Sequence, residues 1–138
     1  MLILGIETSC DETAVCIVSA TSDSVSPTFS VLGNALNSQT KIHEQYGGVF
    51  PALAKREHSK NIIPLFVEVL KQANLETKIS PSISLDKTVV LRELLAREPE
   101  LLELFLKTLP TLTKPSIDAI AVTIGPGLEP ALWVGINF

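Results

Sequence analysis

The chain has 138 residues, of which 46% are hydrophobic and 19% charged, and this composition is typical of one globular domain rather than a disordered polypeptide. Its net charge of −4 excludes a basic footprint for nucleic acid, so an RNA partner would receive little electrostatic attraction from this segment. No apolar run approaches the ~18 residues of a membrane span.

The first two expected elements form a β-hairpin with an acidic tip. Short apolar runs over residues 2–7 and 13–19 predict two strands. The turn between them carries adjacent carboxylates, whose pKa values separate unless a cation or a phosphate-bound metal lies between them. An ordinary solvated turn is equally compatible with this composition, because Thr and Asp also satisfy turn backbone. The polar residues of the tip are Glu7, Thr8, Ser9, Asp11, Glu12 and Thr13.

The following segment predicts a third strand and a long helix. Residues 29–36 alternate loosely, and three consecutive strands with short links favour an antiparallel meander. Residues 37–48 are expected to form a loop. Pro51 suits the first turn of a helix over residues 51–74, which Pro64 is expected to kink.

A small basic cluster lies on the first half of this helix. We interpret it as a solvated face, with contact to phosphate or tRNA as the alternative. His58 alone is more often a structural residue than a ligand, and its spacing from His43 is not that of a metal pair. The cluster consists of Lys55, Arg56, His58 and Lys60.

A leucine-rich segment follows the long helix. Residues 77–84 are expected to form a loop, followed by helices over residues 86–97 and 99–109 that are separated at Glu98-Pro99. The apolar face of this helical hairpin must pack either on the domain's own surface or on a partner chain. Its apolar residues are Leu91, Leu94, Leu95, Leu101, Leu102, Leu104, Phe105, Leu106 and Leu109.

The last expected elements form a strand, a glycine turn and a helix. Residues 118–124 predict a buried parallel strand, and residues 129–138 predict a helix. The intervening turn, with Gly125 and Gly127, would aim backbone N–H groups and the positive helix end at an anion. Glu129 would favour the helix dipole but repel a phosphate at the turn.

Three blocks resemble the TsaD/Gcp family, the tRNA threonylcarbamoyladenosine transferases once named O-sialoglycoprotein endopeptidases. The blocks are ETSCDETA at 7–14, GGVFPALAKREH at 47–58 and DAIAVTIGPGL at 118–128. The resemblance implies an α/β fold of the actin-like ATPase or ribonuclease H type. It implies that residues 1–138 form the N-terminal part of the first actin-like domain and that 77–114 is an inserted helical hairpin. The remainder of the enzyme would lie outside this chain, in agreement with its apolar final residues.

The resemblance also implies a function in tRNA modification. Family members transfer a threonylcarbamoyl group from threonylcarbamoyl-adenylate to N6 of the adenosine next to the anticodon. Asp11 and Glu12 are then the catalytic candidates, either as general base toward N6 or on metal-bound water. The expected ligand is ATP or threonylcarbamoyl-adenylate, and the expected partners are tRNA and TsaB-like and TsaE-like subunits. The candidates for contacts with phosphate or acyl oxygens are Thr8, Ser9, Gly125 and Gly127.

The resemblance further implies one divalent metal, iron or zinc, held by an HxxxH pair and a later aspartate. No HxxxH occurs in these 138 residues, so we expect no metal ligand here and an inactive isolated chain. The N-terminus lacks the basic start of a signal peptide, and Cys10 and Cys16 suit a reducing compartment, so we expect a cytoplasmic location.

Two other classes of protein stay open at this point. A TsaB-like scaffold or dimerisation subunit would be non-catalytic, but such relatives open with a less acidic motif than ETSCDET. A sugar kinase or ATPase of the actin superfamily would require adenosine-binding motifs beyond residue 138. A protease lacks support, because the sequence has no HExxH and no recognisable triad.

Overall fold

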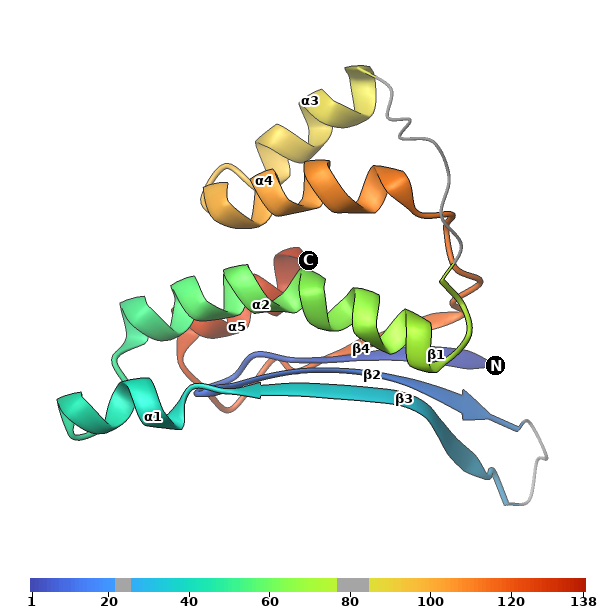
Figure 1. Ribbon diagram of the computed structural model, residues 1–138, viewed down its shortest axis with the longest axis horizontal. Helices are drawn as coiled ribbons and strands as arrows, with labels where there is room; N and C mark the ends of the chain where they lie inside the picture. The colour runs from blue at the N-terminus through green and yellow to red at the C-terminus, as the bar shows by residue number, and fades with distance from the viewer. Residues whose placement is uncertain (22–25, 77–84) are drawn as a thin grey trace.

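The computed structural model describes residues 1–21, 26–76 and 85–138 and has three layers (Figure 1). A four-stranded sheet forms one outer layer. Helices α2 (Pro51–Gln72) and α5 (Glu129–Asn137) cover one face of the sheet. The hairpin of α3 (Leu85–Leu94) and α4 (Pro99–Thr108) lies on the far side of α2, as the third layer.

The sheet consists of β1 (Leu2–Glu7), β2 (Glu12–Ala20), β3 (Phe29–Ser38) and β4 (Ala119–Val122), in the order β3-β2-β1-β4. It confirms the predicted meander and the parallel pairing of the last strand. The prediction that this last strand is buried was wrong, because β4 lies at an edge of the described sheet and Ile120 is 66% exposed. β1 pairs antiparallel with β2, β2 pairs antiparallel with β3, and β4 runs parallel to β1. The observed strand limits differ from the prediction by up to two residues, apart from β1.

One face of the sheet is buried and the other is left without a helix. Every second residue is buried from Leu4 to Ile6 in β1 and from Thr13 to Ile17 in β2, as the two-residue period of a strand requires. A bulge in β3 adds Leu32 between the partners of Ile17 and Val18, and it shifts the alternation at that point. The buried sheet residues that face the helices include Leu4, Ile6, Val15, Ile17 and Ala35.

Helix α2 begins at Pro51 as predicted and runs without interruption through Pro64. It ends at Gln72, two residues before the predicted limit, and Asn74 then adopts a left-handed conformation with φ of 56°. The predicted loop over 37–48 contains a short helix, α1 (Thr40–His43), followed by a 3-10 turn (Glu44–Tyr46). None of the helices in the described ranges is long and apolar enough to cross a membrane.

The helical hairpin packs on the domain's own surface. Both predicted helices are present, but α3 ends at Leu94, three residues before the predicted limit. The side chains of Leu95 and Leu101 are at most 1% exposed and belong to the same apolar cluster as Ile63 and Phe66 of α2. The hairpin therefore lies outside the sheet, as expected, yet it contributes to the main core.

An ion pair fixes the junction of the hairpin on α2. Lys55 Nζ lies 2.9 Å from Glu98 Oε1, and the Ser59 hydroxyl donates to Glu98 Oε2 at 3.3 Å. Lys55 also donates to the main-chain oxygen of Arg97. The interpretation of the basic cluster as a solvated face was therefore wrong for Lys55 and for His58, which is fully buried.

Candidate active site at the hairpin tip

The parallel strands β1 and β4 have their carboxyl ends side by side, next to the hairpin tip. Ile6 lies opposite Val122 in the parallel pair, which places Glu7 beside Thr123. The Glu7 carboxylate accepts the backbone N–H of Ser9 at 2.5 Å and the hydroxyl of Thr123. Burial alone raises the pKa of Glu7, but the hydrogen bonds from Ser9 and Thr123 outweigh it and hold the pKa below its usual value. Glu7 was not among the site residues predicted from the sequence, although an acid that ends a buried strand was the available signal.

The glycine turn packs directly against Ser9. The backbone N–H of Leu128 donates to the main-chain oxygen of Ser9 at 2.8 Å. A Cβ atom built on Gly127 would lie 2.5 Å from that oxygen, so the approach of the two segments requires glycine. Gly125 has a φ of 155° and precedes Pro126 through a cis peptide bond. The structure thus brings Ser9 next to the turn that contains Gly125 and Gly127, and all three residues were predicted to contact phosphate or acyl oxygens.

We expect Gly127→Ala to destabilise the fold by about 1–3 kcal/mol, because the turn must move away from a backbone oxygen. Gly48→Ala is the matched control, since a Cβ there meets nothing within 4 Å, and it should change stability by less than about 0.5 kcal/mol. Urea unfolding of both variants measures the difference. Equal midpoints for the two variants would contradict the close contact between Ser9 and the turn.

Thr8 is buried in the interior beneath the tip. Its side chain is 1% exposed, and its Oγ1 accepts the backbone N–H of Gly135 in α5 at 3.1 Å. A Cβ on Gly135 would lie 2.7 Å from the same hydroxyl. Thr8 therefore joins the hairpin to α5, and this position leaves Ser9 as the better candidate for contact with a ligand.

The two predicted catalytic acids lie on the β3 side of the tip. Thr40 Oγ1 donates to Asp11 Oδ2 at 3.5 Å, and Ser38 Oγ donates to Glu12 Oε1 at 3.4 Å. Partial burial raises the pKa of Glu12, and the neighbouring Asp11 carboxylate raises it further. Glu12 therefore binds a proton more readily than an isolated glutamate does. Among the described contacts, neither carboxylate bonds to the turn at 125–127, so their sharing of one cleft stays a prediction.

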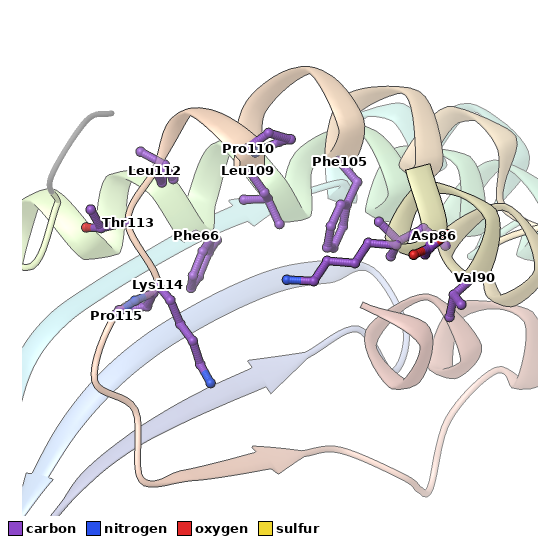
Figure 2. Close-up of a pocket in the computed structure, with 12 residues that line it drawn as sticks. Phe66, Asp86, Val90, Phe105, Leu109, Pro110, Leu112, Thr113, Lys114 and Pro115 are labelled. Carbon is purple, nitrogen blue, oxygen red and sulfur yellow. The ribbon is translucent and has the colours of Figure 1, made fainter. Parts of the chain in front are cut away.

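Hollows on different faces of the described part of the domain differ in character. One, of about 660 Å³, lies between α2 and the helical hairpin and has apolar walls such as Phe66, Phe105 and Leu109 (Figure 2). Another, of about 340 Å³, lies on the bare face of the sheet and contains Glu7 and Thr123. The second hollow adjoins the hairpin tip, so it is the better candidate for a ligand of the polar site.

Metal-binding side chains do not gather at the tip. Within the described ranges, no three His, Cys, Asp or Glu side chains are placed to hold one ion. The adjacent acids offer at most two such groups. This part of the protein therefore does not by itself fit the divalent metal that the resemblance implies.

Comparison with known proteins gives matches over the whole chain. The TsaD family, described as tRNA N6-adenosine threonylcarbamoyltransferase, matches residues 30–83. A protein of that name from Persephonella marina is 36% identical over 137 residues, which is 99% of this chain and 27% of that protein. Proteins of the same name from Thermomicrobium roseum and Fervidobacterium nodosum are 39% and 35% identical over 99% and 100% of this chain. The chain spans between 26% and 28% of the length of these relatives.

Proposed function

Because the chain belongs to the TsaD family, we propose that it forms part of an enzyme that transfers a threonylcarbamoyl group to N6 of an adenosine in tRNA. The observation that carries this proposal is similarity over nearly the whole chain to relatives named as this transferase. The acidic tip supports it, since these acids lie in a block that resembles the family. A scaffold subunit or a sugar kinase receives no comparable support.

Each group at the tip has a role in this transfer. The N6 amine attacks the carbonyl carbon of threonylcarbamoyl-adenylate, the bond to the phosphate oxygen breaks, and AMP leaves. Glu12 accepts the proton from N6, since its raised pKa brings a carboxylate closer to the operating pH of a general base. Asp11 supplies negative charge beside it. Ser9 and the backbone at Gly125 and Gly127 contact phosphate or acyl oxygens.

The remaining components come from outside this segment. We assign the nucleotide site to ATP or threonylcarbamoyl-adenylate, and TsaB-like and TsaE-like subunits to the assembly that acts on tRNA in the cytoplasm. A divalent iron or zinc ion would polarise an oxygen of the substrate, but its ligands would lie beyond the residues described. The meander with a parallel fourth strand supports an actin-like or ribonuclease H-type fold for the domain.

We also propose that residues 77–114 form a hairpin inserted into the first actin-like domain. The family match ends at residue 83, before α3 begins. The hairpin occupies a separate layer and makes no strand of the sheet in the described residues (Figure 1).

The proposed function is tested by incubating the full-length protein with tRNA, synthetic threonylcarbamoyl-adenylate and the partner subunits. Nucleosides released from the tRNA are then analysed by mass spectrometry. We expect an adenosine enlarged by one threonylcarbamoyl group. Unmodified tRNA together with phosphorylation of a sugar would instead identify a kinase, and tRNA modified equally well without the full-length protein would indicate a scaffold.

A further inference from the structure

A buried chain of hydrogen bonds joins the start of α2 to the hairpin tip. His43 Nδ1 accepts the backbone N–H of Phe50 at 3.3 Å, and His43 Nε2 lies 3.0 Å from Gln39 Oε1. Gln39 Nε2 lies 3.3 Å from His58 Nδ1, and His58 Nε2 lies 3.2 Å from the main-chain oxygen of Cys10. The side chains of the two histidines and Gln39 are at most 3% exposed.

The backbone groups at the two ends of this series of hydrogen bonds determine which ring nitrogen of each histidine carries the proton. Because a backbone N–H only donates, His43 Nδ1 accepts from Phe50 and the ring proton lies on Nε2, which donates to Gln39. Because a carbonyl only accepts, His58 carries its proton on Nε2 and donates it to Cys10. The Gln39 oxygen accepts from His43, so the Gln39 amide nitrogen faces His58 Nδ1 and donates to it, which makes Nδ1 an acceptor. The Thr13 hydroxyl then also donates to Nδ1 at 2.7 Å. Both rings are therefore neutral and in the same tautomer.

The surroundings of His58 agree with a neutral ring. Burial lowers the pKa of His58, while the bond to Cys10 offsets this only in part. Glu7 and Asp11 also act to raise this pKa, whereas His43 lowers it. Burial remains the largest of these effects.

These hydrogen bonds hold the backbone on either side of Asp11. His58 holds the Cys10 oxygen, and the backbone N–H of Gln39 donates to the Asp11 oxygen at 2.8 Å. Two consecutive carbonyl groups at the tip are thereby fixed from α2 and from the end of β3. The orientation of the Asp11 and Glu12 carboxylates follows from that of this backbone.

We propose that His58 is a positioning residue, which fixes the backbone at Cys10 and thereby holds Asp11 and Glu12 in the orientation used for transfer. This inference rests on the proposed function of the tip. A small misplacement of a reacting group lowers the rate steeply, by as much as ~10²-fold for about 1 Å. His58 touches no ligand in this scheme and acts only through the main chain.

Two substitutions separate positioning from simple packing. In His58→Gln the amide nitrogen reaches the place of Nε2 and can still donate to the Cys10 oxygen. In His58→Asn the shorter side chain keeps an acceptor near Thr13 and loses the bond to Cys10. In the full-length protein we expect kcat for transfer to fall ~10–100-fold in His58→Asn. We expect a fall of less than ~5-fold in His58→Gln, with KM for tRNA unchanged in both variants.

Thermal unfolding of both variants provides the structural control. If His58 served packing alone, kcat would fall only as far as the folded fraction falls. His58→Gln and His58→Asn would then have the same kcat at equal folded fractions, although only His58→Gln keeps the bond to Cys10. Equal losses of kcat at matched folded fractions, or normal kcat in His58→Asn, would overturn the inference.

The ring itself gives a readout that does not depend on activity. In the full-length protein with 15N-labelled histidine, the His58 signal is assigned by its loss in His58→Gln. We expect a neutral ring protonated on Nε2 at pH 7. A ring protonated on Nδ1, or a charged ring at pH 7, would overturn the inference. Absence of transfer by the unmodified protein would refute the proposed function, whereas normal transfer by His58→Asn would refute only the role of His58.

The pH dependence of stability has a defined sign. A histidine whose folded pKa is lowered binds its proton more readily in the unfolded chain. The stability that it contributes is therefore complete above its unfolded pKa of about 6.5 and declines as the pH falls below that value. We expect His58→Gln to show a weaker decline in this range than the unmodified protein, and an equal decline would contradict the buried neutral ring.

Discussion

Asp11→Asn or Glu12→Gln in the full-length protein is expected to lower the rate of threonylcarbamoyl transfer by ~10²–10⁴-fold, as for loss of an acid–base or charge-stabilising group. Both side chains are half-buried at the hairpin tip and have only long hydrogen bonds to Thr40 and Ser38. Their replacement should therefore leave the unfolding midpoint nearly unchanged. Relief of the repulsion between adjacent carboxylates would, if anything, stabilise the tip.

The rate is measured from the modified nucleoside formed per unit time, at saturating tRNA. Glu93→Gln is the matched control, because it removes one carboxylate from an exposed position of α3, in the outer helical layer. This control should retain full activity. Normal transfer by both tip variants would refute the assignment of catalytic roles to this acid pair.

Leu101→Ala is expected to lower the free energy of unfolding by about 2–5 kcal/mol, the range for deletion of a fully buried leucine side chain. Leu101 is fully buried and belongs to the cluster that includes Ile63 and Phe66 of α2. The expected loss is large because the hairpin is a layer of the same core and not an independently folded appendage.

Leu94→Ala on the same hairpin is the control, since Leu94 is 66% exposed and its removal should change stability by less than about 0.5 kcal/mol. Urea unfolding is followed by the fluorescence of Trp133, which lies on α5, a helix that packs on α2. A Leu101→Ala midpoint equal to that of Leu94→Ala would show that the hairpin unfolds separately from the rest.

Most of the secondary structure could be predicted from the order of the residues alone. Runs of β-branched and apolar residues predicted all four strands, with errors of up to two residues at their ends. Proline at 51 and 99 predicted the starts of α2 and α4, because its fixed φ suits the first turn of a helix. Asp11 and Glu12 are covalent neighbours, so the acidic character of the tip follows from the sequence alone.

Tertiary structure decided the elements whose local signal is weak. The short helix α1 falls in a segment predicted as a loop, since four residues are too few to form a stable helix alone. Packing supplies the missing free energy, because His43 at its end is buried and bonded to Gln39. Helix α3 likewise ends at Leu94, before the predicted limit, and Leu95 beyond it belongs to the core.

The sequence contained one signal for His58 that its positive neighbours obscured. His58 lies four residues after Ala54 and four before Ile62, so all three share the buried face of α2. Its inclusion in a solvated basic cluster followed from residue type and not from helical position. The period of the helix alone placed His58 inside.

The partners of the buried polar groups could only be found in three dimensions. Glu7 meets Thr123, Thr8 meets Gly135 and His58 meets Cys10, and each pair is far apart in the chain. Local pattern predicts which face of an element is buried, but it does not predict which distant group will lie opposite a given donor. Because a buried donor or acceptor without a partner is costly, the packing of α2 and α5 on the sheet selects these pairs, and with them the geometry of the tip.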